Sequence, residues 1–544
     1  MGRMFAFLKA DSFPEVGSSP GGVVSLLGRF RRSLEQVTNR LRARGQARAT
    51  YWLTRFIVLR LLGLVYFIAF LSLAQQVLPL IGENGLLPAQ SYLERVEAHV
   101  GSRFDASLQF PSLFWLGASD GLLTTMAYGG AALSFVVLCG YANAVMLILL
   151  WAVYLSFTFI GQDWYGYGWE IQLLETGFLA IFLCPLLDAR PFPRRPPPAP
   201  VLWLMRWLIF RIMLGAGLIK IRGDACWRDL TCLDYHYETQ PIPNPLSRIL
   251  HFMPAWFQRM GVLYNHFIEL LVPWLAFWPR LARHTAGLLM LSLQVTLIIS
   301  GNLSFLNWLT IVPILACFDD SLLRRVLPAK LVSRAERAAE RASPSRSHRW
   351  AVVVLVVVVM ILSYYPVHNL LSDRQAMNTS FGRLKLVNTY GAFGSVGKER
   401  REIVFEGTDD AVLTRSTRWK EYEFKCKPGD PSRRPCIITP YHYRLDWQIW
   451  FAAMSTPQRY PWTLHLVWKL LHSDPGALDL LANDPFPGSR PRYVRAVLYR
   501  YEFVPSDDPS GAWWKRTPLG VWIPPLSTRD SRLQRFLQAY GWLK

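Results

Sequence analysis

GAGLIKIRGDACWRDLTCLDYHYETQPIPNPLS, residues Gly215 to Ser247, starts as the end of an apolar segment and continues as a polar stretch rich in charge and aromatic rings. Lys220 lies near the end of the apolar part. A lysine in that position covers apolar surface with its stem and extends its ammonium group into water. Cys226 and Cys232 follow closely in the polar part. The stretch therefore predicts a membrane helix that ends near Lys220 and a structured loop beyond it.

The composition of the 544-residue chain indicates a polytopic membrane protein with soluble parts. Hydrophobic residues make up 51% of the chain, charged residues make up 18%, and the mean hydropathy is positive. The 22 tryptophans are typical of membrane–water interfaces. Much of the formal net charge of +21 lies in short stretches beside apolar segments, where it orients helices in a bilayer. We therefore expect the lipid bilayer as a partner, and no nucleic acid.

Nine segments are apolar enough to be candidate membrane spans, each of which needs about 20 mostly apolar residues. The predicted fold class is thus a polytopic α-helical membrane bundle of about nine spans. No cleavable signal peptide is evident, because a long basic stretch precedes the first apolar segment, which is expected to remain as an anchor. The nine segments are 53–78, 122–139, 144–160, 171–187, 202–221, 263–277, 285–300, 303–318 and 350–365.

The basic segments predict the orientation of the bundle. Arginines and lysines are concentrated in residues 1–51 and 319–349, which should both be cytoplasmic, and eight of the predicted spans lie between them. The opening loop and everything after the last span then face the lumenal or exterior side. The predicted organisation is a cytoplasmic N-terminal segment 1–51, a membrane domain 52–318 with an exoplasmic loop 222–262, a cytoplasmic linker 319–349, a last transmembrane helix 350–371 and an exoplasmic domain 372–544.

The C-terminal 173 residues (544 − 371) form a soluble α+β domain by their pattern, and this domain is expected to be rich in strands. In KEYEFKC, residues Tyr422, Phe424 and Cys426 share one face of a strand. The strand candidates are REIVFEG, KEYEFKC and YVRAVLYRYEFV, and the helix candidates are LDWQIWFAAM and TLHLVWKLLHS.

Two cysteine pairs are candidates for disulfide bonds, namely Cys226 with Cys232 and Cys426 with Cys436. Both pairs lie in polar segments at short spacing, on the side that the basic residues assign to an oxidising compartment. No histidine cluster accompanies them, so we expect no zinc or other metal site, and no cofactor. Neither pair is a CxxC motif, which makes thiol exchange a subsidiary idea.

Charged residues inside the apolar segments need partners. Arg211 lies centrally on the same segment as Lys220, and its possible partners are Glu170, Glu175 and Glu269. Besides the exposed position described above, Lys220 has a second interpretation as a partly buried proton acceptor. His266 and Glu269 share a helical face at i, i+3 and are the groups that would assist it. The stretch DWYGYGWE, residues 163–170, is predicted as part of an interfacial aromatic belt.

The loop after Lys220 has the composition of a protein-recognition surface. A disulfide between Cys226 and Cys232 would make it rigid, and tryptophan and tyrosine provide contact area at little entropic cost. The alternative is a plug at the membrane interface. Neither a nucleophile elbow, a phosphate-binding loop, a zinc-protease motif nor a dinucleotide fingerprint occurs in the chain. The candidate contact residues are Asp224, Trp227, Arg228, Asp234, Tyr235, His236 and Tyr237.

Four long motifs resemble the lipase maturation factor family. They are GAGLIKIRGDACWRDLTCLDYHYETQPIPNPLS, HFMPAWFQRMGVLYNHFIELLVPW, NTYGAFGSVGKERREIVFEGT and PYHYRLDWQIWFAAM, and the resemblance extends from the first span onward. It implies a protein of the endoplasmic reticulum membrane, or of the plasma membrane in a prokaryote, that helps secreted lipases fold and assemble. The work would be binding rather than catalysis, with the loop 222–262 and the domain 372–544 in contact with the client.

The membrane half also resembles the helical domain of vitamin K-dependent carboxylases, in which a similar run holds a lysine base. The matching residues are Lys220, in Gly217-Leu218-Ile219-Lys220, followed by Asp224 and Trp227. This resemblance implies an alternative function as a membrane enzyme that uses Lys220 as base, assisted by His266 and Glu269. In the maturation-factor interpretation, Lys220→Ala largely retains client yield, whereas the enzyme interpretation predicts its complete loss.

Overall fold

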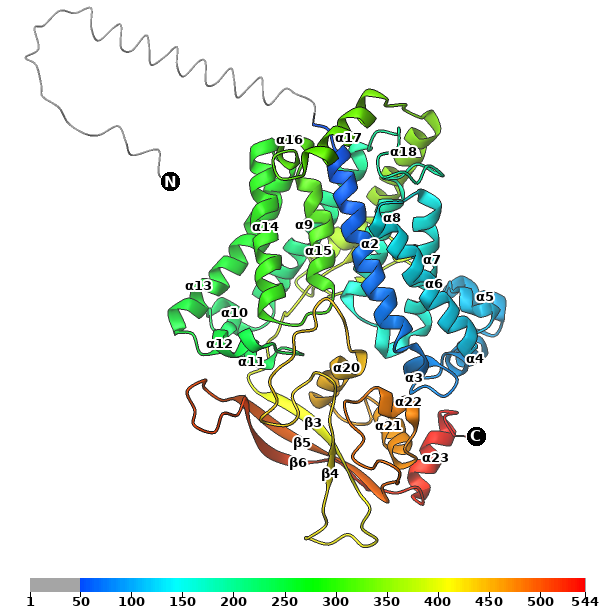
Figure 1. Cartoon of the computed structure of the whole chain (residues 1–544), viewed down its shortest axis with the longest axis vertical. Helices are drawn as coiled ribbons and strands as arrows, with labels where there is room; N and C mark the ends of the chain where they lie inside the picture. Colours follow the sequence, from blue (N-terminus) through cyan, green and yellow to red (C-terminus); the bar gives the residue numbers. More distant parts are fainter. Residues whose placement is uncertain (1–48, 544) are drawn as a thin grey trace, which may run out of the picture. The chain divides into compact units, whose positions relative to one another are not determined.

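The computed structural model describes residues 49–543 of the chain. Thr50–Lys544 is one compact unit, with a bundle of helices in its first part and a small antiparallel sheet with further helices in its last part (Figure 1). Of the predicted cytoplasmic segment 1–51, residues 1–48 lie outside the described residues.

Each of the nine predicted spans contains a helix of the bundle. These segments form helices because their apolar surroundings offer no hydrogen-bond partners, so the backbone N–H and C=O groups must bond to one another within the segment. The helices are α2 (Trp52–Ala74), α6 (Asp120–Cys139), α7 (Ala144–Ile160), α8 (Gly168–Ile181), α9 (Ala199–Arg222), α13 (Ala255–His266) with its continuation η3 (Phe267–Leu271) and η4 (Val272–Phe277), α14 (Arg280–Ser300), α15 (Leu306–Ile314) with η5 (Leu315–Cys317), and α18 (Arg346–Leu362) with α19 (Tyr364–Leu371).

Six helical stretches of the described part of the chain are long and apolar enough to cross a membrane. They establish a helical membrane region, while the number of nine spans stays a prediction. Two further predicted spans, Ala144–Ile160 and Leu306–Cys317, are shorter apolar helices. The ninth contains α8, a helix of 14 residues. The six are Trp52–Ala74, Asp120–Cys139, Ala199–Arg222, Ala255–Phe277, Arg280–Ser300 and Arg346–Leu371.

The basic linker 319–349 and the start of α2 lie at the same end of the bundle. The carboxylate of Asp320 accepts hydrogen bonds from the backbone N–H groups of Trp52 and Leu53, at 3.0 and 2.9 Å. The backbone N–H of Ser343 donates to the carbonyl of Arg194 at 2.8 Å. Two basic segments far apart in the sequence therefore share one end of the helices, which is what a common cytoplasmic side requires.

Shorter helices join these elements and cover the ends of the bundle. Three of them form the loop after α9, at the end of the bundle opposite the basic linker (Figure 1). The short helices are α3 (Val77–Ile81), α4 (Ala89–Val100), α5 (Arg103–Gln109), η1 (Leu113–Leu116), η2 (Gln162–Tyr165), α10 (Ala225–Arg228), α11 (Leu233–Thr239), α12 (Pro245–His251), α16 (Asp320–Leu323) and α17 (Ala329–Glu340).

The C-terminal region contains a four-stranded antiparallel sheet in the order β4-β3-β5-β6. Its central pair, β3 and β5, is in register from Arg400 opposite Tyr501 to Thr408 opposite Tyr493. The elements are β1 (Thr379–Ser380), β2 (Asn388–Thr389), β3 (Arg400–Thr408), β4 (Lys420–Tyr422), α20 (Arg444–Ala453), α21 (Trp462–Leu471), α22 (Pro475–Asp479), β5 (Tyr493–Phe503), β6 (Trp514–Leu526) and α23 (Ser531–Ala539).

The predicted strands REIVFEG and YVRAVLYRYEFV are confirmed as β3 and β5, and the two predicted helices are α20 and α21. KEYEFKC is a strand only as far as Tyr422, but its alternation is confirmed, since Tyr422, Phe424 and Cys426 are all buried. No pattern in the sequence predicted β6, which contains Pro518. Proline is tolerated there because β6 is an edge strand and needs no donor on its free side.

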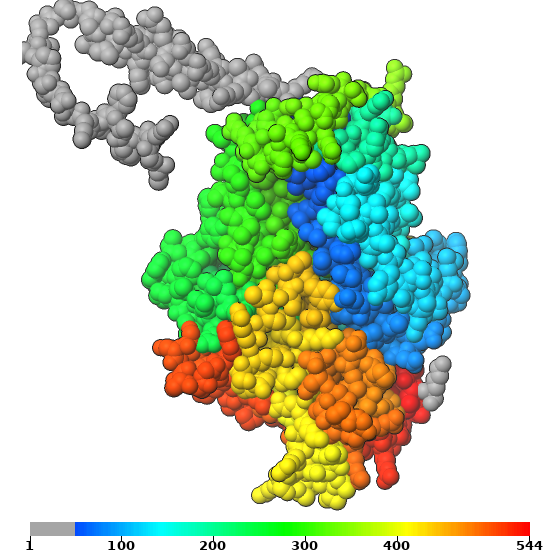
Figure 2. Space-filling view, in the orientation of Figure 1, coloured from blue at the N-terminus to red at the C-terminus, as the bar shows by residue number. Residues whose placement is uncertain are grey.

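The aromatic turn 163–170 is not an interfacial belt, contrary to the sequence-based expectation. Its rings are buried because the C-terminal region packs on them. The guanidinium of Arg444 lies 3.6 Å from the ring centroid of Tyr165 and 2.8 Å from the carboxylate of Glu170. Trp169 packs against Trp447 of α20, with ring centroids 4.9 Å apart. The yellow and orange C-terminal region accordingly lies directly against the blue and green helices (Figure 2).

Candidate functional site

The GAG motif of α9 sets the geometry around Lys220. A Cβ atom on Gly217 would lie 2.7 Å from the side chain of Leu270 and 3.0 Å from that of Glu269. A Cβ atom on Gly215 would lie 2.4 Å from the carbonyl oxygen of Tyr390. Glycine at both positions therefore lets the π-helical turn η3 and the C-terminal segment around Tyr390 approach the backbone of α9 closely.

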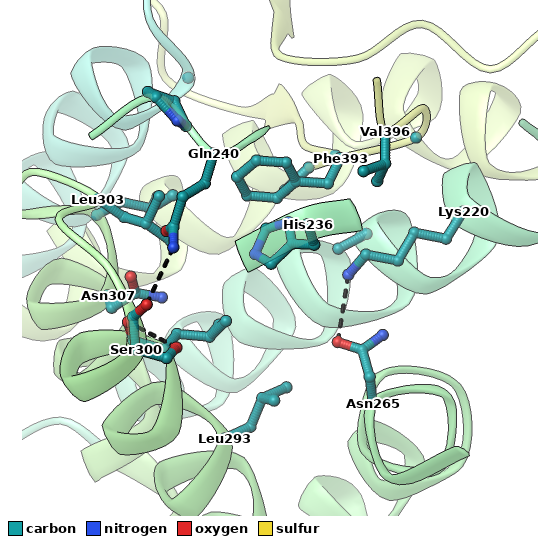
Figure 3. A pocket seen from close by; sticks show the side chains of 18 of the residues that line it. Lys220, His236, Gln240, Asn265, Leu293, Ser300, Leu303, Asn307, Phe393 and Val396 are labelled. Carbon is teal, nitrogen blue, oxygen red and sulfur yellow. Dashed lines mark hydrogen bonds between the residues drawn. The ribbon is translucent and has the colours of Figure 1, made fainter. Parts of the chain in front are cut away.

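This close approach places the ammonium group of Lys220 against the carboxylate of Glu269. The two Nζ–O distances are 2.5 and 2.7 Å, and Asn265 lies at 3.4 Å from the ammonium group (Figure 3). Lys220 and Glu269 are each 4% exposed. The prediction that Lys220 extends into water was therefore wrong, because a carboxylate from a segment 49 residues away binds its ammonium group inside the protein.

The other predicted partner of Lys220 lies nearby but makes a different contact. His266 Nε2 lies 3.0 Å from the carbonyl oxygen of Trp227, and the Trp227 ring faces the Lys220 ammonium group at 5.1 Å. Thus the structure brings Lys220, Trp227, His266 and Glu269 together, as a lysine–carboxylate pair flanked by an indole and an imidazole.

The three carboxylates that the sequence offered to Arg211 pair with three different cations. Arg211 binds Glu175, which also accepts from the Tyr390 hydroxyl at 2.7 Å. Glu170 binds Arg444 of the C-terminal region and Glu269 binds Lys220. All three pairs are buried. Glu175 is therefore confirmed as the partner of Arg211. Glu170 and Glu269 neutralise Arg444 and Lys220 instead, and the apolar pattern of the sequence did not predict these two pairs.

Both candidate disulfides, Cys226–Cys232 and Cys426–Cys436, are formed in the structure. The first joins the start of α10 to the start of α11, and its sulfur atoms pack with Trp227, Val262 and Val396 in a small hydrophobic core. The loop is built of the three short helices α10, α11 and α12. Its proline at 245 opens α12, where the Asn244 side chain and Ser247 form a capping box.

The seven predicted contact residues of the loop differ in their exposure. Trp227, His236 and Tyr237 are buried, whereas Arg228 is exposed. Asp224, Asp234 and Tyr235 are half-buried. The indole of Trp227 donates to the carbonyl of Phe393 at 2.8 Å. Most of the aromatic area of the loop is thus directed inward, against the C-terminal region.

Arg400 at the start of β3 binds the backbone of the same loop from the sheet. Its guanidinium donates to the backbone carbonyls of Glu238, Gln240 and Pro241, at 2.8, 2.5 and 2.9 Å. The carboxylate of Glu238 in turn accepts from the backbone N–H of Phe503 at 2.6 Å. The loop after α9 and the sheet are therefore joined by hydrogen bonds, and together they form what is called here the loop layer.

A cavity of about 840 Å³ lies beneath this layer, between α9, α14, α15, the loop helices and residues 377–397 (Figure 3). Lys220, His236, Asn265 and Glu269 are among its lining residues. Sequence reasoning missed the segment 390–397 as a lining element, although GAFGS within it is the kind of small-residue run that permits close approach to α9.

No group of three or more His, Cys, Asp or Glu side chains that could hold a metal ion occurs within residues 49–543. The groups described above can form ion pairs and hydrogen bonds, and they enclose an apolar space.

The comparison with known proteins agrees with this architecture. The model of the lipase maturation factor transmembrane domain matches residues 53–325, and that of the lipase maturation factor C-terminal domain matches residues 386–524. This chain belongs to the lipase maturation factor family. As a member of that family with six helical stretches of membrane-spanning length within residues 49–543, it is an integral membrane protein.

Several relatives of this family member cover nearly its whole length. Lipase maturation factor 1 of Bos taurus is 49% identical, over 95% of this chain and 94% of its own. Lipase maturation factor 1 of Homo sapiens is 48% identical, over 91% of each chain. Lipase maturation factor 2 of Xenopus laevis is 31% identical, over 88% of this chain and 83% of its own. No solved structure matches the chain significantly.

These findings do not support the alternative of a carboxylase-like enzyme. Both matching family models describe lipase maturation factors.

Proposed function

We propose that this protein assists the folding and assembly of secreted lipases at the endoplasmic reticulum membrane, by binding rather than by catalysis. The observation that supports this proposal most strongly is the family match, which extends over both the transmembrane and the C-terminal domain. The relatives are named as lipase maturation factors, and the similarity covers 95% of this chain in the bovine case.

The client surface that we propose is the layer formed by the loop 222–262 and the C-terminal region 372–544. In this arrangement Trp227, His236 and Tyr237 are buried inside the layer and stabilise it, and Arg228 belongs to its exposed face. Asp224 has a positioning role, because it accepts a hydrogen bond from the N–H of Cys226 and so caps α10. Asp234 and Tyr235 are half-buried at the margin of the same face.

The connection between β3 and β4, residues 409–419, is the second part of the proposed client surface. It extends from the sheet on the side away from the membrane helices (Figure 1). Val412 is 72% exposed and Leu413 is 38% exposed. Apolar side chains that a soluble loop presents to solvent are typical of protein–protein contacts, and an incompletely folded client offers the complementary apolar surface.

Orientation is part of the proposal. The basic linker 319–349 and the start of α2 lie at the end opposite the loop 222–262, as a cytoplasmic position of both would require. The two disulfides, Cys226–Cys232 and Cys426–Cys436, are in keeping with an oxidising lumen around the opposite end.

The test is a lipase maturation assay in cells that lack their own maturation factor, with the full-length chain supplied together with a secreted dimeric lipase. The wild-type chain should restore secreted lipase activity and should crosslink to the lipase from the lumenal side. Val412→Ser combined with Leu413→Ser should weaken crosslinking by about tenfold, as the loss of a contact worth about 1.4 kcal/mol would.

The matched control is Phe104→Ser combined with Leu108→Ser, since these α5 residues are also exposed and apolar, at 71% and 51%, and lie outside both parts of the proposed client surface. This pair should behave as the wild type does. Recovery of no lipase in crosslinks from any lumenal position, together with unchanged lipase secretion, would contradict the proposed function.

A further inference from the structure

The cavity of about 840 Å³ beneath the loop layer has the size of a site for a small molecule, for which volumes of about 300 to 1,000 Å³ are typical. It is too small to admit a folded part of a client protein. Its walls are mainly apolar, with Met213, Ala216, Leu293, Leu297, Phe393 and Trp450 among the lining residues. A space of this kind favours a ligand with a largely apolar body.

The lining of the cavity includes exposed side chains of two membrane helices. Met260 of α13 and Ile299 of α14 both line it, and they are 57% and 54% exposed. Both helices are long and apolar enough to cross a membrane, Ala255–Phe277 as the continuation of α13 and Arg280–Ser300 as α14. Exposed apolar side chains on such helices contact lipid, so a ligand that enters here comes from the bilayer.

His236 is a buried polar residue of the wall whose side chain has no hydrogen-bond partner within the described residues. The imidazole of His236 is 6% exposed and forms no hydrogen bond with any of the residues 49–543, and Figure 3 shows it projecting between Phe393 and Lys220 into the cavity. Burial and the nearby Lys220 lower the pKa of His236 to about 4, which leaves the ring neutral at physiological pH. A neutral imidazole offers one donor and one acceptor, which matches a hydroxyl or an ester carbonyl.

The lining carries no net charge. Lys220 and Glu269 are the formally charged residues among the described lining residues, and they neutralise each other at 2.5 Å. A ligand with a charged head group would have to bury that charge without a counter-ion of its own, which is strongly unfavourable. Neutral amides in the wall already have hydrogen-bond partners, as in the bond of 2.9 Å from Asn307 to Gln294 and the bond of 3.0 Å from Gln172 to Thr310.

We propose that this cavity binds one uncharged acyl lipid with a hydrogen-bonding head group, such as a monoacylglycerol. The acyl chain lies along the apolar wall between α9 and α14, and the head group bonds to His236 near the Lys220–Glu269 pair. The lipid enters from the bilayer between Met260 and Ile299. This binding site does not depend on the proposed role in lipase maturation, and it would exist whatever the client is.

The test uses the full-length chain in phosphatidylcholine nanodiscs with a photoreactive monoacylglycerol that carries a diazirine in its acyl chain. We expect crosslinked peptides from α14 and from residues 390–397, and competition by unlabelled monoacylglycerol. Leu297→Trp, which fills the cavity, should reduce labelling by about tenfold. Val295→Trp is the matched control, because Val295 lies on the same helix, is 45% exposed and does not line the cavity.

Two further arms keep the result decisive. His236→Phe keeps an aromatic ring at this position but removes its hydrogen-bonding nitrogens. It should lower labelling without lowering the thermal unfolding temperature, which covers the case in which Leu297→Trp fails to fold. The anionic photoreactive fatty acid with the same chain should label weakly. Three results would overturn the proposal. They are labelling outside the cavity lining, labelling that is unchanged in both variants, and stronger labelling by the fatty acid than by the monoacylglycerol.

Discussion

Lys220 and Glu269 form an ion pair inside the protein, with Nζ–O distances of 2.5 and 2.7 Å, at the point where the membrane helix α9 meets the loop that covers it. Both residues are 4% exposed, so each charge depends on the other for its neutralisation. The pair joins the π-helical turn after α13 to the end of α9, and Gly217 makes this approach possible because a Cβ atom there would collide with Leu270 and Glu269.

Lys220→Met should lower the free energy of unfolding by about 3–5 kcal/mol, because it leaves the Glu269 carboxylate buried without a counter-ion. The double variant Lys220→Met/Glu269→Leu should recover most of this loss, since two apolar side chains then replace the pair. Denaturant unfolding of the purified chain in lipid nanodiscs measures both. Equal instability of the single and the double variant would mean that the ion pair is not the reason for the effect.

The same double variant separates binding from catalysis. If the protein works by binding its client, Lys220→Met/Glu269→Leu should support secreted lipase activity close to that of the wild type. If Lys220 were a catalytic base, activity would be abolished in a protein that is folded normally. The measurement is secreted lipase activity per amount of folded variant, with Lys330→Met, at an exposed position of the linker 319–349, as the control.

Arg400→Lys should loosen the loop after α9 without removing the charge next to Glu402. A lysine ammonium group cannot reach the three carbonyls of Glu238, Gln240 and Pro241 as the planar guanidinium does. We expect faster amide hydrogen exchange in residues 233–247, measured by mass spectrometry. The free energy of unfolding should decrease by about 1.5–3 kcal/mol. Arg401→Lys is the control, because its side chain is 49% exposed. Unchanged exchange in the loop would show that other contacts hold it.

Stability should fall as the pH decreases from about 6.5 to 4, in part because of His236. The pKa of this buried ring is lowered to about 4, whereas an unfolded histidine titrates near 6.5, so the unfolded chain binds more protons in this window. The contribution is complete above pH 6.5 and amounts to about 3 kcal/mol, lost by pH 4. His236→Phe should remove this part of the slope in pH-dependent unfolding curves, and His99→Phe, at an exposed position, should not. Identical slopes for His236→Phe and the wild type would contradict the assignment.

Sealed microsomes test the orientation of the chain. In a variant in which the exposed Cys139 is replaced by serine, a membrane-impermeant maleimide should label Glu336→Cys of α17 directly. It should label Val412→Cys of the β3–β4 connection only after the membrane is permeabilised. The opposite pattern would reverse the assignment of the basic linker to the cytoplasm and remove the lumenal client surface.

Local patterns were sufficient for the helices of the bundle and for β3, β5, α20 and α21, although not for β6. Long apolar runs indicated the helices of the bundle, and the alternation in residues 420–426 indicated which side chains of that segment are buried. The short spacing of Cys226 and Cys232, and of Cys426 and Cys436, was sufficient for the two disulfides. These features depend on neighbours within a few residues, which the order of the amino acids specifies directly.

Only the tertiary structure decided which charges meet and which aromatic residues are buried. Hydropathy showed that Arg211 needs a carboxylate, but Glu175 and not Glu170 or Glu269 binds it, because other segments bring Arg444 and Lys220 to those two. The cavity likewise exists because residues 390–397 pack beside α9, well over a hundred positions away in the chain. Contacts at such separations arise from the packing of whole helices and strands, which no local periodicity encodes.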